Sequence, residues 1–189
     1  MPIRGRKMKK YIKALLFLSA IILLSSCAPV LPVPEVVVPP KWDYEKDAIR
    51  LHLKGDPQMH LHQGVPHTLV FCLYHLIDPN AFNQLIDEKG GLEKLCECSR
   101  FDPSVTNATR FIMNPNEELT KLLDRPANAK YVGVIAGYYQ LQKENVFRLF
   151  PIPVVEEKKG GAIYQNPGVL NIDLYLGPQQ IQDVRGIQK

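Results

Sequence analysis

Apolar and polar residues alternate with a period of two in two stretches of the chain, residues 46–54 (KDAIRLHLK) and 169–176 (VLNIDLYL). This period is typical of β-strands that bury one face and expose the other to water. Residues 68–76 (TLVFCLYHL) are almost continuously apolar, which favours a central strand that is covered on both faces. The three stretches therefore predict a protein built mainly of β-sheet.

Further strands are predicted over residues 106–114, 130–139 and 145–154, which contain many β-branched or aromatic residues. Proline has no amide proton to donate to a neighbouring strand, so Pro151 and Pro153 make the last of these an edge strand. Short strands at this spacing, separated by turns that contain glycine and proline, favour an antiparallel β-sandwich.

Helical structure is expected in a smaller part of the chain. Asp78 and Pro79 predict the N-cap and the first position of a helix that ends near Gly90 and Gly91. Residues 116–124 are compatible with either a helical turn or a strand. The sequence thus predicts a mainly β fold, an antiparallel sandwich of two sheets with one or two short inserted helices.

The N-terminus has the order of a bacterial lipoprotein signal. Residues 1–13 contain six lysines and arginines and no acid, and residues 14–26 (ALLFLSAIILLSS) are almost wholly apolar. The motif LSSC (24–27) then predicts cleavage before Cys27 and a covalent lipid on its thiol. The apolar run is shorter than the roughly 20 residues that span a bilayer; an uncleaved anchor and a secreted protein are the alternatives. Ala28, in place of an aspartate, favours the outer membrane over retention at the inner membrane.

Four segments are predicted: a signal peptide (1–26), the lipidated cysteine with a Pro-rich spacer (27–41), a sandwich domain (42–178) and a polar tail (179–189). The five prolines of the spacer favour an extended polyproline II chain that lifts the domain off the lipid, and its valines could instead pack along a neighbouring segment. The whole chain carries a net charge of +4, but without the six basic residues of the signal the mature chain carries −2. The charge therefore does not favour a nucleic-acid partner.

Residues 55–67 (GDPQMHLHQGVPH) form a long connection between two predicted strands. Loops of this length in a compact domain are usually functional. Met59, Leu61 and Val65 are apolar, although a fully solvated loop does not need apolar side chains. We therefore expect this loop to be functional, with its apolar side chains exposed.

All five histidines of the chain lie in or beside this loop, and imidazole is the commonest metal ligand. They are His52, His60, His62, His67 and His75. Their spacing does not match a recognisable zinc motif. The favoured interpretation is therefore that they are ordinary loop and surface residues that bind no metal. The alternative function is a periplasmic metal-binding lipoprotein that uses this histidine cluster.

Three cysteines remain once Cys27 carries lipid: Cys72, Cys96 and Cys98. In an oxidising periplasm Cys72 is expected to pair with Cys96 or Cys98, and three reduced thiols are the alternative. The aromatic pair at 138–139 is predicted to belong to the core and a sheet face. The chain contains no nucleophile elbow and no phosphate-binding glycine loop. We therefore predict a non-enzymatic protein without a small-molecule substrate, metal or cofactor other than its covalent lipid.

Two motifs resemble those of a known family. The run VFCLYHLIDPNAF (70–82) is similar to a strand that ends in a Tyr-x-Leu step and is followed closely by an aspartate and a phenylalanine, and KYVGVIAGYY (130–139) is similar to a Tyr-Val-Gly-Val-x-Ala-x-Tyr strand. The residues that match the first motif are Tyr74, Leu76, Asp78 and Phe82. With the LSSC motif and the spacer, these stretches resemble the TssJ (SciN) lipoproteins of type VI secretion systems.

The resemblance implies a transthyretin-like β-sandwich on an outer-membrane lipoprotein that faces the periplasm. It implies a partner, the periplasmic domain of TssM, within a TssJ–TssL–TssM membrane complex. In that family the loop between the first two strands of the sandwich contacts TssM, and here that loop is 55–66. The residues that this implies for partner binding are Asp56, Met59, His60, Leu61, His62 and Gln63.

Overall fold

The structure, a computed structural model, describes residues 35–183; the predicted signal peptide, Cys27, the first half of the spacer and the end of the predicted polar tail lie outside this range. Of these, residues 36–183 belong to one compact unit. Its elements, in chain order, are β1 (Val36–Val38), β2 (Glu45–Gly55), β3 (Leu69–Leu76), α2 (Asn80–Asp87), α3 (Gly91–Leu95), β4 (Val105–Met113), β5 (Glu118–Arg125), β6 (Tyr131–Ala136), α4 (Lys143–Val146), β7 (Phe147–Pro151), β8 (Val154–Lys159), β9 (Ala162–Pro167), β10 (Leu170–Leu176) and β11 (Ile181–Asp183).

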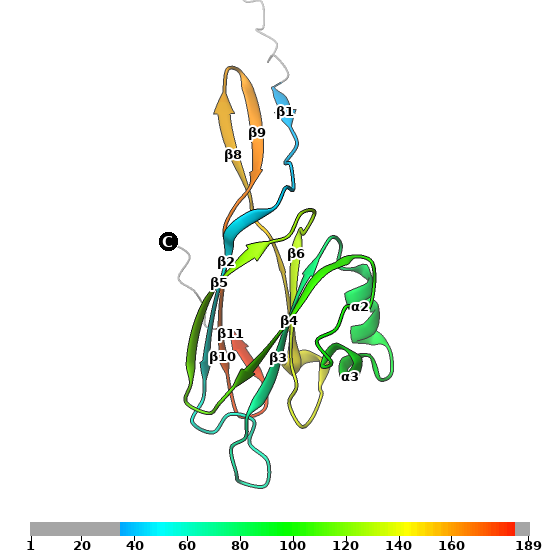
Figure 1. Ribbon diagram of the computed structural model, residues 1–189, viewed down its shortest axis with the longest axis vertical. Coiled ribbons are helices and arrows are strands. Elements are labelled where there is room, and N and C mark those ends of the chain that lie inside the picture. Colours follow the sequence, from blue (N-terminus) through cyan, green and yellow to red (C-terminus); the bar gives the residue numbers. More distant parts are fainter. Residues whose placement is uncertain (1–34, 184–189) are drawn as a thin grey trace, which may run out of the picture. The chain divides into compact units, whose positions relative to one another are not determined.

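Two four-stranded sheets form the predicted sandwich (Figure 1). One has the order β4-β3-β6-β7 with every neighbouring pair antiparallel, and β3 lies in its interior, as its continuous apolar sequence predicts. β7 is an edge strand, as predicted, and it ends at Pro151. The mainly β sandwich fold with short helices is therefore confirmed.

The second sheet has the order β11-β10-β2-β5, and one of its pairs departs from the prediction. β10 runs parallel to β2 over seven residue pairs from Leu170–Ile49 to Leu176–Gly55, so the expectation of a wholly antiparallel sandwich is wrong. The reason lies in the strands before them: β1 is parallel to β9, and β1 leads into β2 as β9 leads into β10. A pair of strands that starts in parallel continues in parallel.

The core lies between the two sheets and continues beneath the helices. Ile49, Leu51 and Leu53 of β2 are fully buried, as their alternation with polar residues predicts. On the opposite face of β3, Tyr74 packs against Phe82 of α2, and its hydroxyl donates a hydrogen bond to the carbonyl of Leu95. Both faces of β3 are thus covered, one by the second sheet and one by α2 and α3 (Figure 1).

A disulfide fixes the segment after α3 to the sheet. Cys72 of β3 is bonded to Cys98, which resolves the choice that the sequence left open between Cys96 and Cys98. Cys96 keeps a half-buried free thiol, and burial raises the pKa of this thiol to about 11. The thiol therefore stays protonated at neutral pH and is a poor nucleophile.

A third sheet, of order β1-β9-β8, was not predicted. Val36–Val38 pair with β9, so these three residues of the expected spacer form a strand, in line with the second role considered for its valines. The strand predicted over 145–154 ends at Pro151, and β8 begins a new hairpin at Val154. β11 lies within the predicted polar tail, where Ile181 is buried; the sandwich therefore extends beyond residue 178.

One local prediction also needs correction, and one choice that the sequence left open, between a helical turn and a strand over residues 116–124, is resolved. The helix α2 has Pro79, not Asp78, at its N-cap, although the Asp78 carboxylate still accepts a hydrogen bond (3.0 Å) from the amide of Asn80. Residues 118–125 are a strand rather than a helical turn, because pairing with β2 outweighs their helical propensity.

Candidate functional site

The loop between β2 and β3 is held in one conformation by backbone hydrogen bonds to two neighbouring turns. At its start, the amide of Gly55 donates to the carbonyl of Glu117 (2.8 Å) and the amide of Asp56 donates to that of Leu176 (2.9 Å). Farther along, the amide of Leu61 donates to the carbonyl of Pro178 (2.8 Å). The loop therefore joins the β4–β5 and β10–β11 turns in a single surface at this end of the sandwich (Figure 1).

Asp56 holds the first turn of the loop. One carboxylate oxygen accepts a hydrogen bond from the amide of Gln58 (2.6 Å), and the other accepts one from the hydroxyl of Tyr175 on β10 (2.7 Å). The bond to the carboxylate raises the pKa of Tyr175 above its ordinary value. Asp56, predicted to contact a partner, is thus engaged inside the protein and positions the loop.

Met59 is fully buried beneath the loop. Its sulfur would lie 3.2 Å from a Cβ placed on Gly55, so glycine at the end of β2 makes room for this side chain. The expectation that Met59 is an exposed side chain of the loop is therefore wrong. The loop folds back over the end of the core, and Met59 fills the space below it.

The tip of the loop is a tight two-residue turn. The backbone groups of His62 and Val65 exchange two hydrogen bonds of 2.9 Å, and Gln63 and Gly64 between them have φ angles of 51° and 77°. Positive φ at both central positions is the geometry of a type I′ turn, which glycine adopts without strain. The turn holds Gln63 and Val65 out into solvent; Val65 is 55% exposed.

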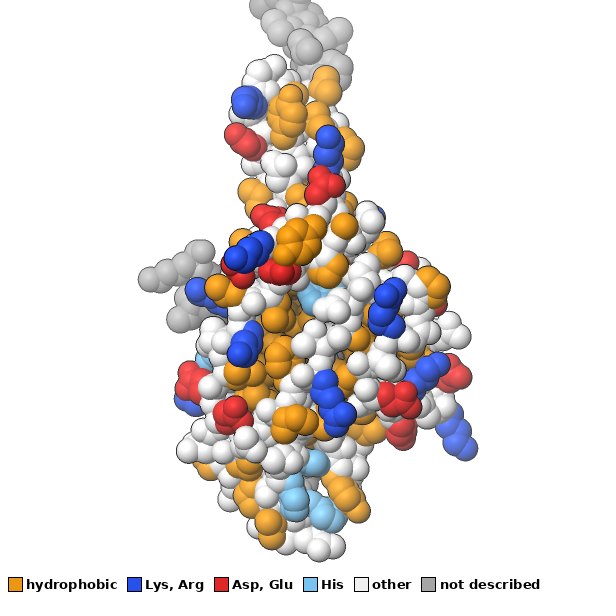
Figure 2. Space-filling model, in the orientation of Figure 1, with side chains coloured by type: hydrophobic (Ala, Val, Ile, Leu, Met, Phe, Trp, Pro, Cys, Tyr) orange, Lys and Arg blue, Asp and Glu red, His pale blue; other side chains and the backbone are white. Residues whose placement is uncertain are grey.

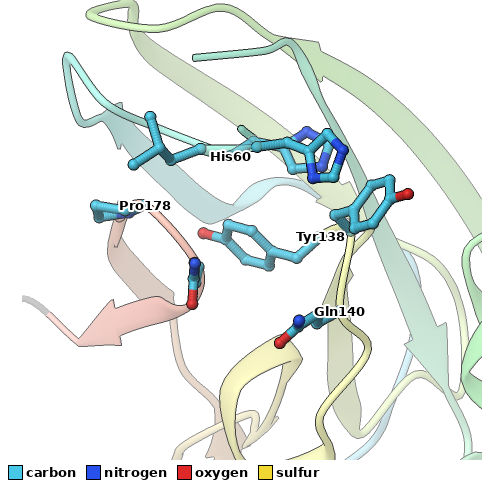
Figure 3. A pocket seen from close by; sticks show the side chains of 8 residues that line it. His60, Tyr138, Gln140 and Pro178 are labelled. Carbon is cyan, nitrogen blue, oxygen red and sulfur yellow. The ribbon is translucent and has the colours of Figure 1, made fainter. Parts of the chain in front are cut away.

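Two tyrosines from the segment after β6 support the tip. The ring of His62 stacks on Tyr139, with centroids 3.7 Å apart and an angle of 25° between the planes. Tyr138 is buried, and its hydroxyl donates to the carbonyl of Gln180 (2.9 Å). His60 meets Tyr138 edge-on, and its Nδ1 is 2.7 Å from the carbonyl of Thr68. These side chains surround a small pocket of about 50 Å³ (Figure 3).

The resulting surface combines an apolar centre with polar neighbours. It comprises exposed or half-exposed side chains that we call the tip patch: Leu61, His62, Gln63, Val65 and Tyr139. Figure 2 shows histidine and hydrophobic side chains gathered at the end of the molecule that this loop forms. Tyr139 was not predicted to be part of the site, because a pair of adjacent tyrosines does not indicate which of the two faces outward.

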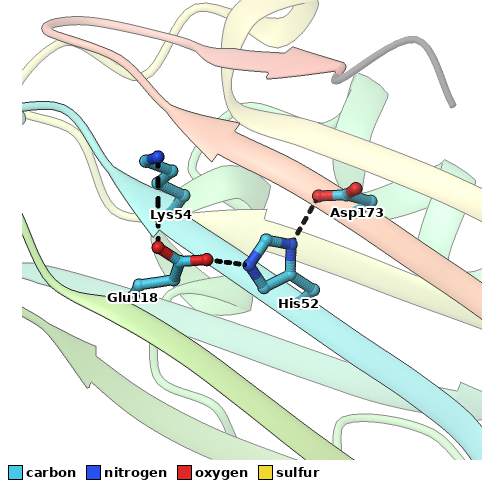
Figure 4. A network of polar contacts seen from close by, with 4 residues as sticks. All are labelled: His52, Lys54, Glu118 and Asp173. Atoms are coloured by element: carbon cyan, nitrogen blue, oxygen red, sulfur yellow. Dashed lines mark hydrogen bonds and ion pairs between the residues drawn. The ribbon is translucent and has the colours of Figure 1, made fainter.

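The structure separates the five histidines into three places. His60, His62 and His67 lie together at the tip, with ring centroids 6.0–6.3 Å apart for the two pairs that include His67. On the exposed face of the second sheet, His52 lies between Asp173 (2.8 Å from Nδ1) and Glu118 (2.9 Å from Nε2) (Figure 4). Hydrogen bonds to these two carboxylates raise the pKa of His52, and the bond to Glu118 has the larger effect. His52 in turn lowers the pKa of Glu118.

His75, the fifth histidine, is buried in β3 and faces the second sheet. It is 2% exposed, and within the described part of the chain neither ring nitrogen has a hydrogen-bond partner at ordinary distance. Burial lowers its pKa to about 4, although backbone groups of Asp124 and Asn107 and the Asp124 carboxylate oppose this shift. His75 is therefore a neutral core residue at neutral pH.

Among residues 35–183, no three His, Cys, Asp or Glu side chains are placed to hold a metal ion together. This division of the histidines gives the metal-binding alternative no support. Over the same residues, no helix is both long and apolar enough to cross a membrane. What the site offers is a rigid, partly apolar protrusion, a surface suited to another protein.

Comparisons with known proteins agree with the fold described above. The P. aeruginosa lipoprotein TssJ1 of the type VI secretion system is 20% identical, with a TM-score of 0.53 over 77% of this chain and 96% of that chain. The S. marcescens Lip, a membrane-bound component of that system, is 18% identical with the same TM-score, over 74% and 98%. A structure described as the TssM C-terminal domain from EAEC matches at 11% identity and a TM-score of 0.53, over 72% and 96%. At these identities the likeness shows the fold alone.

Among curated proteins, none matched the chain. Residues 47–172, two thirds of the sequence, match the family described as type VI secretion lipoprotein, which includes VasD, EvfM and TssJ. This span contains most of β2, the whole of β3 and the loop between them, together with the strand β6 that carries the second motif. The chain belongs to the type VI secretion lipoprotein (TssJ) family.

Proposed function

We propose that this protein is a non-enzymatic outer-membrane lipoprotein that anchors a type VI secretion membrane complex. Cys27 carries the lipid, the domain faces the periplasm, and the tip patch binds the periplasmic domain of TssM within a complex that also contains TssL. The membership of the family supports the secretion role. The site, the partner and the outer-membrane location are the proposal itself.

One observation carries the choice of surface: the loop is rigid in its base and exposed at its tip. Backbone bonds to two turns, the Asp56–Tyr175 bond and buried Met59 fix the base, while Val65 and Tyr139 are 55% and 68% exposed. A surface ordered before binding loses less conformational entropy on association. An aromatic and an aliphatic side chain at its centre are the kind of residues that contribute most to protein interfaces.

Calorimetry with the soluble periplasmic domain of TssM from the same bacterium tests this proposal. In Val65→Asp and Tyr139→Ala, affinity is expected to fall at least thirtyfold, about 2 kcal/mol or more for a residue at the centre of an interface. Neither substitution removes a buried side chain, so the melting temperature should stay near that of the wild type.

Leu122→Asp is the matched control. Leu122 is 54% exposed on β5, as exposed as Val65, and it lies on a sheet face away from the tip. This variant should bind TssM as the wild type does. Equal affinity for all four proteins would contradict the tip patch as the binding surface, and no binding by the folded wild type would contradict TssM as the partner.

A further inference from the structure

The third sheet projects from the sandwich as a narrow ribbon (Figure 1). All six residues of β8 are exposed, and valines and a tyrosine of this ribbon face solvent, with Val36 63%, Val155 57% and Tyr164 40% exposed. Exposed apolar side chains on a short edge sheet are unusual unless they contact something. The function proposed above gives this ribbon no role.

The pairing of β1 shows where the chain enters the ribbon. β1 is parallel to β9, and Val36 is opposite Ala162, which directly follows the turn at Gly160 and Gly161. The chain that comes from the N-terminus therefore reaches the domain at the far end of the ribbon, beside this turn, and not at its base. We call this end, residues 158–163 with Val36 and Val37, the ribbon end.

Val36 lies nine positions after Cys27 in the sequence. A fully extended chain covers at most about 3.6 Å per residue, so Val36 lies within about 30 Å of a lipid on Cys27. No other part of the domain is as close to Cys27 along the chain. The proposed anchor thus brings the ribbon end, before anything else, to the membrane surface.

The chemistry of the ribbon end suits phospholipid. In each of the two cross-strand rows nearest the turn, a lysine of β8, an apolar residue of β9 and a valine of β1 lie side by side: Lys159, Ala162 and Val36 in one, Lys158, Ile163 and Val37 in the other. The acids Glu156 and Glu157 follow farther from the turn, and Glu35 precedes β1. A lysine beside apolar side chains can place its ammonium among phosphates while the apolar groups meet the acyl boundary.

We propose that the ribbon end is a second membrane contact, which rests against anionic phospholipid headgroups of the leaflet that holds the lipid on Cys27. This inference depends on the function proposed above, because the contact requires the lipid on Cys27. The tip patch lies at the end of the sandwich away from the ribbon (Figure 1). The contact would therefore direct the tip patch from the membrane toward a partner that crosses the periplasm.

Lysine footprinting of the full lipidated chain tests this contact. The chain is reconstituted on vesicles of phosphatidylethanolamine and phosphatidylglycerol (3:1), acetylated with a lysine-reactive ester and analysed by mass spectrometry, with the same chain in detergent as the reference. Lys159 is expected to react at least threefold more slowly on vesicles, while Lys121, exposed on β5, reacts equally in both. A lysine near an anionic surface gains about 1 kcal/mol, or about fivefold, so protection should weaken severalfold on phosphatidylcholine vesicles.

The double variant Val36→Asp with Val37→Asp should abolish the protection of Lys159. Leu122→Asp also replaces an exposed apolar residue by an acid, but on β5, and it should leave the protection intact. If the chain floats with the vesicles and Lys159 still reacts as fast as in detergent, the membrane contact is overturned and the lipid anchor stands. If the chain does not float with the vesicles, the anchor at Cys27 fails, and the contact that depends on it fails with it.

Discussion

Burial of His75 makes the stability of the domain depend on pH in a way that one substitution removes. The folded protein holds the pKa of His75 at about 4, and the unfolded chain should show the ordinary value of 6.5. Between these values the unfolded state binds a proton that the folded state does not, so lowering the pH favours unfolding. His75 therefore costs no stability well above pH 6.5, and it lowers the free energy of unfolding progressively as the pH falls toward 4.

The size of the loss follows from the two pKa values. Their difference corresponds to about 3 kcal/mol in total, of which about 2 kcal/mol are lost between pH 7.5 and pH 5. His52 acts in the opposite direction, because Glu118 and Asp173 raise its pKa and protonation strengthens these pairs. The wild type alone would show the sum of both effects, and a comparison with a variant separates them.

The measurement is urea unfolding, followed by circular dichroism, of the wild type and His75→Leu at pH 7.5 and pH 5. Leucine has a similar volume and does not titrate, and the contribution of His52 cancels between the two proteins. The wild type should lose about 2 kcal/mol more than His75→Leu over this range. An equal loss in the two proteins would refute the argument that His75 is buried and neutral.

Three further predictions concern the packing that supports the site. Removal of the disulfide in Cys72→Ala with Cys98→Ala should cost about 3 kcal/mol, since the bond closes a loop of 26 residues, whereas Cys96→Ala, which leaves the bond intact, should cost clearly less; urea unfolding of the three proteins compares them. Gly133→Ala should lower the melting temperature, at about 1 to 3 kcal/mol, because its Cβ would lie 2.8 Å from the ring of Phe82, and Phe82→Leu added to it should recover part of the loss if this clash is the cause. Met59→Ala should destabilise by about 2 to 5 kcal/mol and speed hydrogen exchange in residues 55–67; unchanged exchange there would show that Met59 does not hold the loop.

The sequence predicts the strands that carry a clear apolar pattern. It does not predict the strands that form only because they pair with a neighbouring strand. β2, β3 and β10 carry clear apolar patterns, because each has a buried face on the core. All residues of β8 are exposed and none of β9 is fully buried, so no apolar period marks these strands, and their partner β1 lies in a Pro-rich stretch. The local sequence does not predict a strand that is stabilised mainly by hydrogen bonds to strands distant along the chain.

For the site, the sequence predicts the segment but not the direction of its side chains. Its length and apolar content single out 55–67, yet Met59 faces the core, Asp56 holds the backbone, and Tyr139 joins from another segment. Which apolar side chain of a loop faces inward depends on the turns that the loop folds back upon. Here those turns come from residues more than 50 positions away along the chain.

Site-specific photocrosslinking in the native bacterium tests the central claim most directly. A photoreactive amino acid replaces Gln63 at the tip of the loop in the lipidated chain, and in a second strain it replaces Leu122 on β5. The account predicts a crosslink to TssM from position 63, none from position 122, and loss of the crosslink when Cys27→Ser removes the anchor. A crosslink from position 122 but not from position 63, with both proteins in the outer-membrane fraction, would contradict it.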